Sequence, residues 1–261
     1  MSVLPFCHEL RELSLYRVEI PPLACDVDLP LVHTLQKLSL TYSTLAWMDG
    51  LVFPQLQKFV VDEYGWPERF KRKVGMPACS HIVFRQSTLK SLPVLQSDFH
   101  LPFLETWELV GAWSNFEYVY GFSALQRVHA KRFKFHLNYS SKGFLELLGS
   151  KDEVERLDLL FQGGYIGTVE SAWDILIKMS VTNYRTMKVP CPDMKVLVLQ
   201  FDGQLDADKE RFSRLCRQMM NNRRLAGYSL EKCYIWWRNP DRQKAAPFVL
   251  ITENEEVRTE E

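Results

Sequence analysis

The sequence predicts an α/β solenoid, in which short parallel strands stack into a curved sheet with loops and helices on the convex side. Three observations predict this fold class. An apolar motif recurs along the chain, proline interrupts the segments between its early copies, and helical patterns are confined to the later segments. The apolar share of the 261 residues, 46%, is sufficient for one continuous core.

The recurring motif has apolar residues at positions 1, 4 and 6, as in Leu10-x-x-Leu13-x-Leu15. Its nine copies begin at Leu10, Leu35, Leu56, Cys79, Leu104, Leu125, Val154, Met194 and Leu230. Successive copies are separated by 25, 21, 23, 25, 21, 29, 40 and 36 residues. The first five intervals lie within the period of roughly 20–29 residues that is typical of leucine-rich repeats. We therefore predict a leucine-rich-repeat domain of about nine irregular repeats over residues 1–252, followed by a disordered acidic tail at residues 253–261.

The spacing within the motif has a mechanical cause. Alternate side chains of a strand point to opposite faces, so positions 4 and 6 of each copy point into the core. Position 1 enters the same core from the turn before the strand, and each unit buries its apolar row only against its neighbours. Positions 3, 5 and 7 are then expected on the concave face of the sheet.

The connecting segments change in character along the chain. The early ones contain prolines that exclude a long helix, at Pro21, Pro22, Pro30, Pro54 and Pro67. In the later ones, Thr168 is predicted to cap a helix with the apolar stripe Val169, Trp173, Leu176 and Ile177. Asp206 is predicted to cap a second helix with the stripe Phe212, Leu215, Cys216, Met219 and Met220.

The overall composition points away from nucleic acid and membrane. Lys plus Arg and Asp plus Glu both total 32, so the net charge is about zero and no partner of either class is expected. The six cysteines are scattered, which suits a reducing compartment. The N-terminus does not resemble a signal peptide, and the apolar run at residues 245–251 is too short to span a bilayer. We expect a cytoplasmic or nuclear protein.

No segment has the spacing of a catalytic, cofactor or metal site. The segment GFSAL at residues 121–125 begins like a nucleophile elbow but lacks the closing glycine. Gly163 and Gly164 are not followed by the Lys-Ser/Thr pair of a phosphate loop. The carboxylates of residues 202–210 suit a helix start better than a calcium loop. Histidines and cysteines show no ligand spacing, so we predict no catalytic residue, no cofactor and no metal.

The expected concave face carries two clusters, one basic in the middle of the chain and one apolar and aromatic near the C-terminus. Arg, Tyr and Trp are the side chains that most often anchor interfaces. The candidate partner-binding residues are His81, Arg85, Glu108, Arg127, His129, Lys131, Arg156, Tyr234 and Trp236.

Two other interpretations of this face stay open. Lys and Arg are also the ordinary residues of a solvated sheet face. The apolar end can instead be covered by the closing segment at residues 247–252, whose four apolar side chains need a surface to bury against. That end comprises Leu160, Val196, Val198, Tyr234 and Trp236.

Four segments carry a family resemblance: LRELSLYRVEIPPL at residues 10–23, LPLVHTLQKLSL at 29–40, Leu45-Ala-Trp47-Met48, and Cys79-Ser-His81-Ile82. Together with the longer late repeats, over about residues 4–252, they resemble the leucine-rich-repeat region of the large F-box-like protein family of mushroom-forming basidiomycete fungi. The resemblance implies the substrate-recognition part of a cullin-type ubiquitin ligase, whose N-terminal F-box grips a small adaptor. The family's F-box begins with Leu-Pro-x-Glu, whereas the first repeat here begins by Leu10. A ligase adaptor is therefore expected as a partner only where an F-box precedes this chain.

We expect a non-enzymatic protein-binding repeat domain with an unidentified protein partner on its concave face. The first alternative is a free-standing leucine-rich-repeat scaffold, or a truncated fragment, with no link to ubiquitin ligases. The second is an α/β hydrolase-like enzyme, which would need a Ser–His–acid arrangement that the sequence does not display.

Overall fold

The chain divides into two compact units in a computed structural model. The first unit comprises Met1–Val110 and Arg127–His129, and the second Gly111–Gln126 and Ala130–Glu261. The structure describes residues 9–20, 29–41, 43, 45–62, 70–85, 99–110, 129–137, 148–149, 151–162, 166–180, 189–202, 209–228, 230–238, 248–251 and 256–259. Among the helices within these ranges, none combines the length and the apolarity that a membrane span requires.

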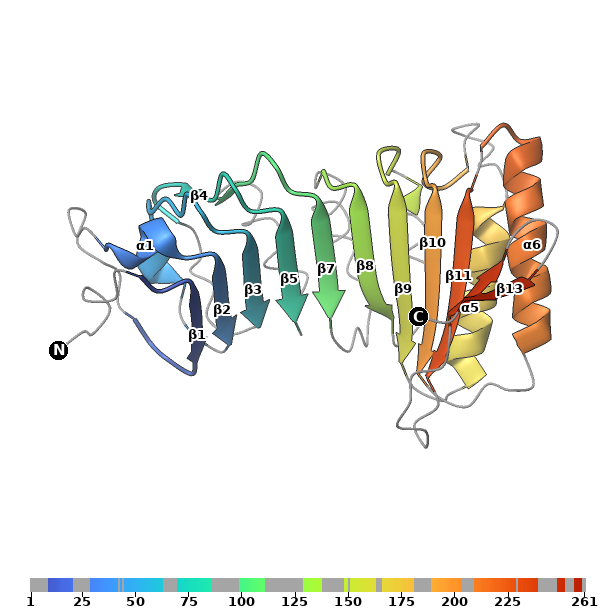
Figure 1. The fold of residues 1–261 in the computed structure, drawn as a ribbon, viewed down its shortest axis with the longest axis horizontal. Coiled ribbons are helices and arrows are strands. Elements are labelled where there is room, and N and C mark those ends of the chain that lie inside the picture. Colours follow the sequence, from blue (N-terminus) through green and yellow to red (C-terminus); the bar gives the residue numbers. More distant parts are fainter. Residues whose placement is uncertain are drawn as a thin grey trace. The chain divides into compact units, whose positions relative to one another are not determined.

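The first unit is built on a parallel sheet (Figure 1). Its strands, paired in this order, are β1 (Glu12–Tyr16), β2 (Lys37–Thr41), β3 (Lys58–Asp62), β5 (His81–Arg85) and β7 (Thr106–Val110). A two-stranded parallel sheet pairs β4 (Val74–Gly75) with β6 (Phe99–His100), and the short helices are α1 (Leu31–Thr34) and η2 (Ala46–Met48). The early connections thus hold only short helices in their described parts, as the prolines predict.

Two rows of side chains run across these five strands and form the core. The first row is Leu13, Leu38, Phe59, Ile82 and Trp107, and the second is Leu15, Leu40, Val61, Phe84 and Leu109. Both rows are buried from β2 onward. In β1 they are half-buried, because an end strand has a neighbour on one side only. The predicted ladder of positions 4 and 6 is confirmed in this unit.

The turns before the strands repeat one hydrogen-bond pattern. The carbonyl oxygen of Arg11, at motif position 2, accepts the amide N–H groups of Gln36 and Lys37, at positions 2 and 3 of the next motif. The position-2 carbonyls of Gln36, Gln57 and Ser80 accept the equivalent pairs of amides. The same pattern continues in the second unit from Lys131, Glu155 and Lys195. The repeat is therefore visible in the backbone as well as in the apolar pattern.

The second unit has a mixed sheet that begins with four parallel strands: β8 (Arg132–Leu137), β9 (Arg156–Gln162), β10 (Val196–Asp202) and β11 (Lys232–Arg238). The antiparallel strands β12 (Phe248–Ile251) and β13 (Glu256–Thr259) extend it beyond β11. Its long helices are α5 (Ile166–Met179) and α6 (Lys209–Leu225). The chain thus has a solenoid-like repeat fold with a mostly parallel sheet and few helices, as predicted at this level.

The sixth repeat lies five residues later than the sequence predicts. The expected motif began at Leu125, outside the described residues, and ended at Ala130. The strand instead begins at Arg132, with Phe133 paired to Leu157. Ala130 takes position 1, because Lys131 supplies the position-2 carbonyl. The prediction was wrong because the motif was aligned on aliphatic residues, whereas Phe133 and Phe135 fill the core positions of this strand.

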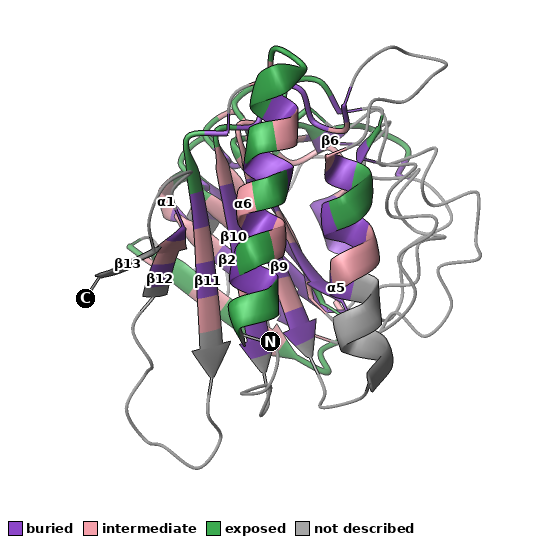
Figure 2. Ribbon diagram, turned by 90° about the vertical axis from the view of Figure 1, so that its right-hand side faces the viewer, coloured by how far each residue is buried: buried purple, intermediate pink, exposed green. Residues whose placement is uncertain are grey.

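Helices α5 and α6 pack on one face of the second sheet (Figure 2). That face carries Phe161 and Phe201, whose rings stack with centroids 5.0 Å apart. Phe212 of α6 packs on Phe201 at 4.8 Å and on Trp173 of α5 at 5.8 Å. The predicted stripe of α6 is confirmed, since its members are buried except for the half-buried Leu215.

The expected start and stripe of the earlier helix need correction. Thr168 lies inside α5, which begins at Ile166, and Ile177 is 52% exposed. In residues 172–179, where the side chains are described, the buried ones are Ala172, Ile175, Leu176 and Met179, so Leu176 of the expected stripe is confirmed, while Val169 lies outside the described side chains. They follow the i, i+3, i+4, i+7 spacing of one helix face, which the small Ala172 made hard to recognise. Asp206, the expected cap of α6, lies outside the described residues.

The end of the chain also differs from the expectation. Residues 253–261 were predicted to be disordered, but Glu256–Thr259 form β13, which pairs with β12. Strand β12 would otherwise present a row of unpaired backbone groups, and β13 hydrogen-bonds to that row. Backbone pairing therefore orders a segment whose composition alone suggests disorder.

A buried arginine joins α5, α6 and the turn before β10. Arg223 of α6 has no exposed surface. Its Nη1 donates to the carbonyl oxygens of Met179 at 3.2 Å and Pro190 at 2.8 Å, and its Nη2 donates to that of Cys191 at 2.7 Å. Met179 is the last residue of α5, where carbonyls lack partners within the helix. The guanidinium thus satisfies backbone groups from two other segments at once.

Candidate protein-binding face

The sheet of the second unit, strands β8 to β13, has one face opposite α5 and α6. We call it the free face because no described helix or strand packs against it. Strand alternation and register place on it the residues at motif positions 3, 5 and 7, with Leu250 beside Tyr234. These residues are Arg132, Lys134, His136, Arg156, Asp158, Leu160, Val196, Val198, Gln200, Lys232, Tyr234, Trp236 and Leu250. They include three of the sequence-predicted site residues: Arg156, Tyr234 and Trp236.

The basic part of the free face is organised around one buried carboxylate. Arg132 and Arg156 lie directly opposite each other on β8 and β9, and Asp158 lies two residues further along β9. Arg132 Nε donates to Asp158 Oδ2 at 2.7 Å, and Arg156 Nε donates to Oδ1 at 2.9 Å. The Asp158 side chain is 4% exposed, whereas those of the two arginines are 40% and 41% exposed. One buried carboxylate therefore holds two half-exposed guanidinium groups of the same face in place.

The apolar part of the free face lies beside this basic part. Val198, paired to Asp158 in the register, is buried, while Leu160, Tyr234 and Trp236 are half-buried. The closing strand β12 pairs edge to edge with β11. It therefore widens the sheet and adds Leu250 to the face, so residues 248–251 do not cover the apolar end as the alternative interpretation of the closing segment expected.

In the first unit the predicted residues lie on β5 and β7. His81 Nε2 is 3.2 Å from Glu108 Oε2, and their side chains are 27% and 13% exposed. Arg85 ends β5 and is exposed. Between them on the same face, Val83 is buried. The structure thus brings His81 and Glu108 together as a polar pair.

Of the three remaining predicted residues, two lie off the free face and one is not among the described residues. Arg127 lies outside the described residues, and His129 and Lys131 precede β8. In their place β8 presents Arg132 and Lys134, which sequence reasoning missed because it set the sixth motif five residues too early. The signal that could have found them is the alternation of two phenylalanines at 133 and 135 with basic residues at 132 and 134.

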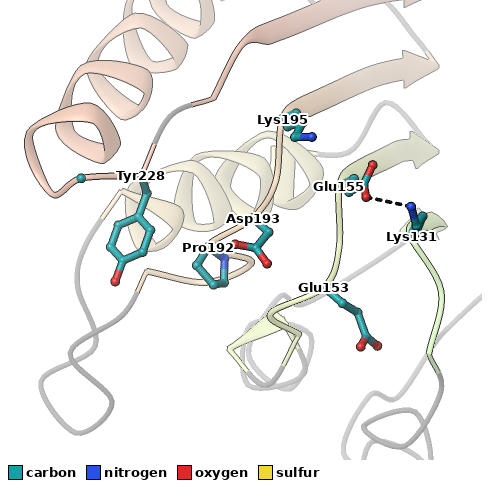
Figure 3. A pocket seen from close by; sticks show the side chains of 8 residues that line it. Lys131, Glu153, Glu155, Pro192, Asp193, Lys195 and Tyr228 are labelled. Atoms are coloured by element: carbon teal, nitrogen blue, oxygen red, sulfur yellow. Dashed lines mark ion pairs between the residues drawn. The ribbon is translucent and has the colours of Figure 1, made fainter.

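Lys131 instead lines a cavity of about 620 Å³ beside the turns that precede the parallel strands of the second unit (Figure 3). Lys131 Nζ forms an ion pair with Glu155 Oε1 at 3.1 Å. The other lining residues are Glu153, Pro192, Asp193, Lys195, Gly227 and Tyr228. Among its described lining residues, three carboxylates and two ammonium groups nearly balance, and there is neither a Ser, Thr or Cys nucleophile nor a His base.

Burial shifts the pKa values of three titratable groups toward their uncharged forms: Cys79 in the turn before β5, and Lys151 and Cys191 in the second unit. Burial raises the pKa of Cys79 to about 11 and that of Cys191 to about 12, so both thiols stay protonated at neutral pH. Burial lowers the pKa of Lys151 to about 8. Within the described part of the chain, no three His, Cys, Asp or Glu side chains gather where a metal ion could be held. None of these groups forms a nucleophile–base pair in the described contacts.

The comparisons with known proteins leave function to be inferred from these residues. The chain matches no family model, no curated protein and no solved structure.

Proposed function

We propose that the chain is a non-enzymatic protein-binding repeat domain that recognises its partner with the free face of the second unit. The observation that carries the proposal is the juxtaposition on one sheet face of two oriented guanidinium groups with Leu160, Tyr234 and Trp236. Arg, Tyr and Trp are enriched among interface residues that dominate binding energy. A sheet face with helices on its other side offers them a rigid support, so little conformational entropy is lost on binding.

The test is affinity purification from native cells with the wild-type chain and two matched double variants. The face variant carries Tyr234→Ala and Trp236→Ala, and the helix-side control carries Ile177→Ala and Leu225→Ala. The control residues are exposed, at 52% and 76%, and lie on α5 and α6. Truncating a central anchor typically costs about 2 kcal/mol or more, or roughly a 30-fold loss of affinity.

We expect a set of proteins recovered with the wild type and the control and lost with the face variant. Equal recovery with all three proteins would place the binding surface elsewhere. Circular dichroism spectra and melting curves of the three proteins establish that the variants are folded.

We further propose that the repeats are of the leucine-rich type and act as the substrate-recognition part of an F-box-type ubiquitin-ligase adaptor. The motif spacing and the family resemblance support this finer proposal. Its test is to read the genomic sequence upstream of the Met1 codon and to probe the purified product for the small cullin adaptor. An in-frame F-box with adaptor recovery is the expected result, and an upstream stop codon without adaptor recovery would favour a free-standing scaffold.

A further inference from the structure

Two cysteines meet between α6 and β11 in the core of the second unit. Cys216 of α6 and Cys233 of β11 have no exposed surface, and both are free thiols. A side-chain hydrogen bond joins the two thiol groups. The helix and the strand therefore bring together two potential nucleophiles that are 17 residues apart in the chain.

The position of each cysteine follows from the pattern of its element. Cys216 lies four residues after Phe212, whose ring packs on Phe201 of the sheet, so both side chains share the helix face that covers the sheet (Figure 2). Cys233 occupies motif position 4 and pairs in the register with Leu197 of β10, which is fully buried. Cys216 thus contacts the inner row of the sheet from the helix that lies over it.

The surroundings of the pair exclude two other roles for it. Among the described residues, no third His, Cys, Asp or Glu completes a cluster that could hold a metal ion. The hydrogen bond with Cys233, together with burial, raises the pKa of the Cys216 thiol well above its usual value, so this thiol is protonated at neutral pH and is a poor nucleophile there. The reaction that two adjacent thiols share is oxidation to a disulfide.

We infer that Cys216 and Cys233 form a redox-sensitive disulfide that links α6 to β11 when the chain folds in the presence of a small disulfide compound such as oxidised glutathione. One protein thiolate attacks oxidised glutathione, forms a mixed disulfide and releases one glutathione thiolate. The second protein thiolate attacks the protein sulfur of the mixed disulfide and releases the other glutathione thiolate. The two electrons and two protons that the protein loses are recovered in two molecules of reduced glutathione.

The disulfide should stabilise the fold, and the fold should favour the disulfide by the same factor. Closing a loop of 17 residues removes conformational freedom from the unfolded chain. Because such a coupling is reciprocal, folding should raise the equilibrium constant for forming this disulfide by about 100-fold. The burial of both sulfur atoms also shields the disulfide, once formed, from thiols in solution.

The experiment refolds the full-length chain from urea in mixtures of reduced and oxidised glutathione. Refolding is used because buried, protonated thiols react slowly in the native protein. Free thiols are then blocked with iodoacetamide, and the tryptic peptides are identified by mass spectrometry. The disulfide joins the peptide of residues 215–217 to that of residues 233–238, because trypsin cleaves after the Arg or Lys on either side. A parallel series that is kept in urea measures the same pair in the unfolded chain.

The folded chain should contain the linked peptides, and half-oxidation should occur at a value of [GSH]²/[GSSG] about 100-fold higher than in urea. The control Cys191→Ala removes another buried thiol of the same unit and should leave this value unchanged. By circular dichroism, the oxidised wild type should melt about 6–12 °C above the reduced form. Cys216→Ala should melt at the same temperature in both glutathione mixtures.

Three results would overturn the inference: no linked peptides after folding in the most oxidising mixture, the same half-oxidation point for the folded and the urea-unfolded chain, or an oxidised form that melts below the reduced one. If Cys216→Ala does not fold, the linked peptides of the wild type and of Cys191→Ala decide the question without it.

Discussion

Replacing Arg223 by methionine should destabilise the second unit strongly. Methionine retains the aliphatic volume of the side chain but removes three hydrogen bonds from a charged donor to the carbonyls of Met179, Pro190 and Cys191. Each such bond contributes about 1.5–3 kcal/mol, or about 4.5–9 kcal/mol together. The methionine variant no longer has to bury a charged guanidinium, and the desolvation cost that it avoids offsets a few kcal/mol of this sum. A net loss of about 3–5 kcal/mol in the free energy of unfolding remains.

The assay is urea denaturation followed by circular dichroism. With a slope of about 2 kcal/mol per molar urea, the midpoint should fall by about 2 M. The matched control is Arg224→Met, one residue along, where the side chain is exposed and its Nη2 donates to Asn221 Oδ1 at 2.9 Å; its effect should stay within about 0.5 kcal/mol. Arg223→Lys keeps the charge but not the planar guanidinium, so its urea midpoint should lie between those of the two methionine variants. This variant keeps the test decisive where Arg223→Met does not fold. A methionine variant within about 1 kcal/mol of the wild type would refute the reasoning.

Three further effects are expected. Burial lowers the pKa of Lys151 from 10.5 to about 8, so between these values the unfolded chain binds a proton that the folded chain does not. The free energy of unfolding of the wild type relative to Lys151→Met should therefore rise from about pH 7.5 to about pH 10, by up to about 3 kcal/mol; a constant difference in urea denaturation would contradict this. Trp107→Ala removes a side chain that is 2% exposed and should cost about 3–5 kcal/mol in the same assay, whereas Phe103→Ala, at a 70% exposed residue, should cost less than about 0.5 kcal/mol. Gly227→Ala should cost about 1 kcal/mol, because this residue follows α6 at φ +86° with open space around a Cβ, so only backbone strain opposes the change; an unchanged midpoint would contradict the left-handed backbone.

The sequence predicted the buried rows at motif positions 4 and 6 because alternate residues of a strand point to the same face, so buried positions recur at every second residue. Leu38, Ile82 and Leu197 each lie at position 4 of a motif and are fully buried. The stripe of α6 was readable for the same reason, through Phe212 and Cys216 at helical spacing. Both patterns arise from residues close together in the chain, where one strand or one helix turn determines which side chains share a face.

The prediction failed where a motif used unexpected residue types. Ala130 is a small position-1 residue and Phe133 an aromatic position-4 residue, so the repeat they define was passed over for a nearby aliphatic copy. In α5 the small Ala172 was likewise overlooked, and the exposed Ile177 was assigned to the core. The local sequence cannot determine which of two alternative sets of residues occupies the core positions, since this depends on how the side chains fit against another segment.

The amino-acid sequence by itself determined that parallel strands recur and which of their side chains form the core, because alternation along a strand is a local property. Only the tertiary structure decided which charges meet across strands. The register of β8 against β9 places Arg132 opposite Arg156 above Asp158. Strand β12 pairs with the edge of β11, so Leu250 lies beside Tyr234 on the same face as the two arginines. Both outcomes depend on backbone hydrogen bonds between segments far apart in the chain, and such bonds carry no signature in the local order of residues.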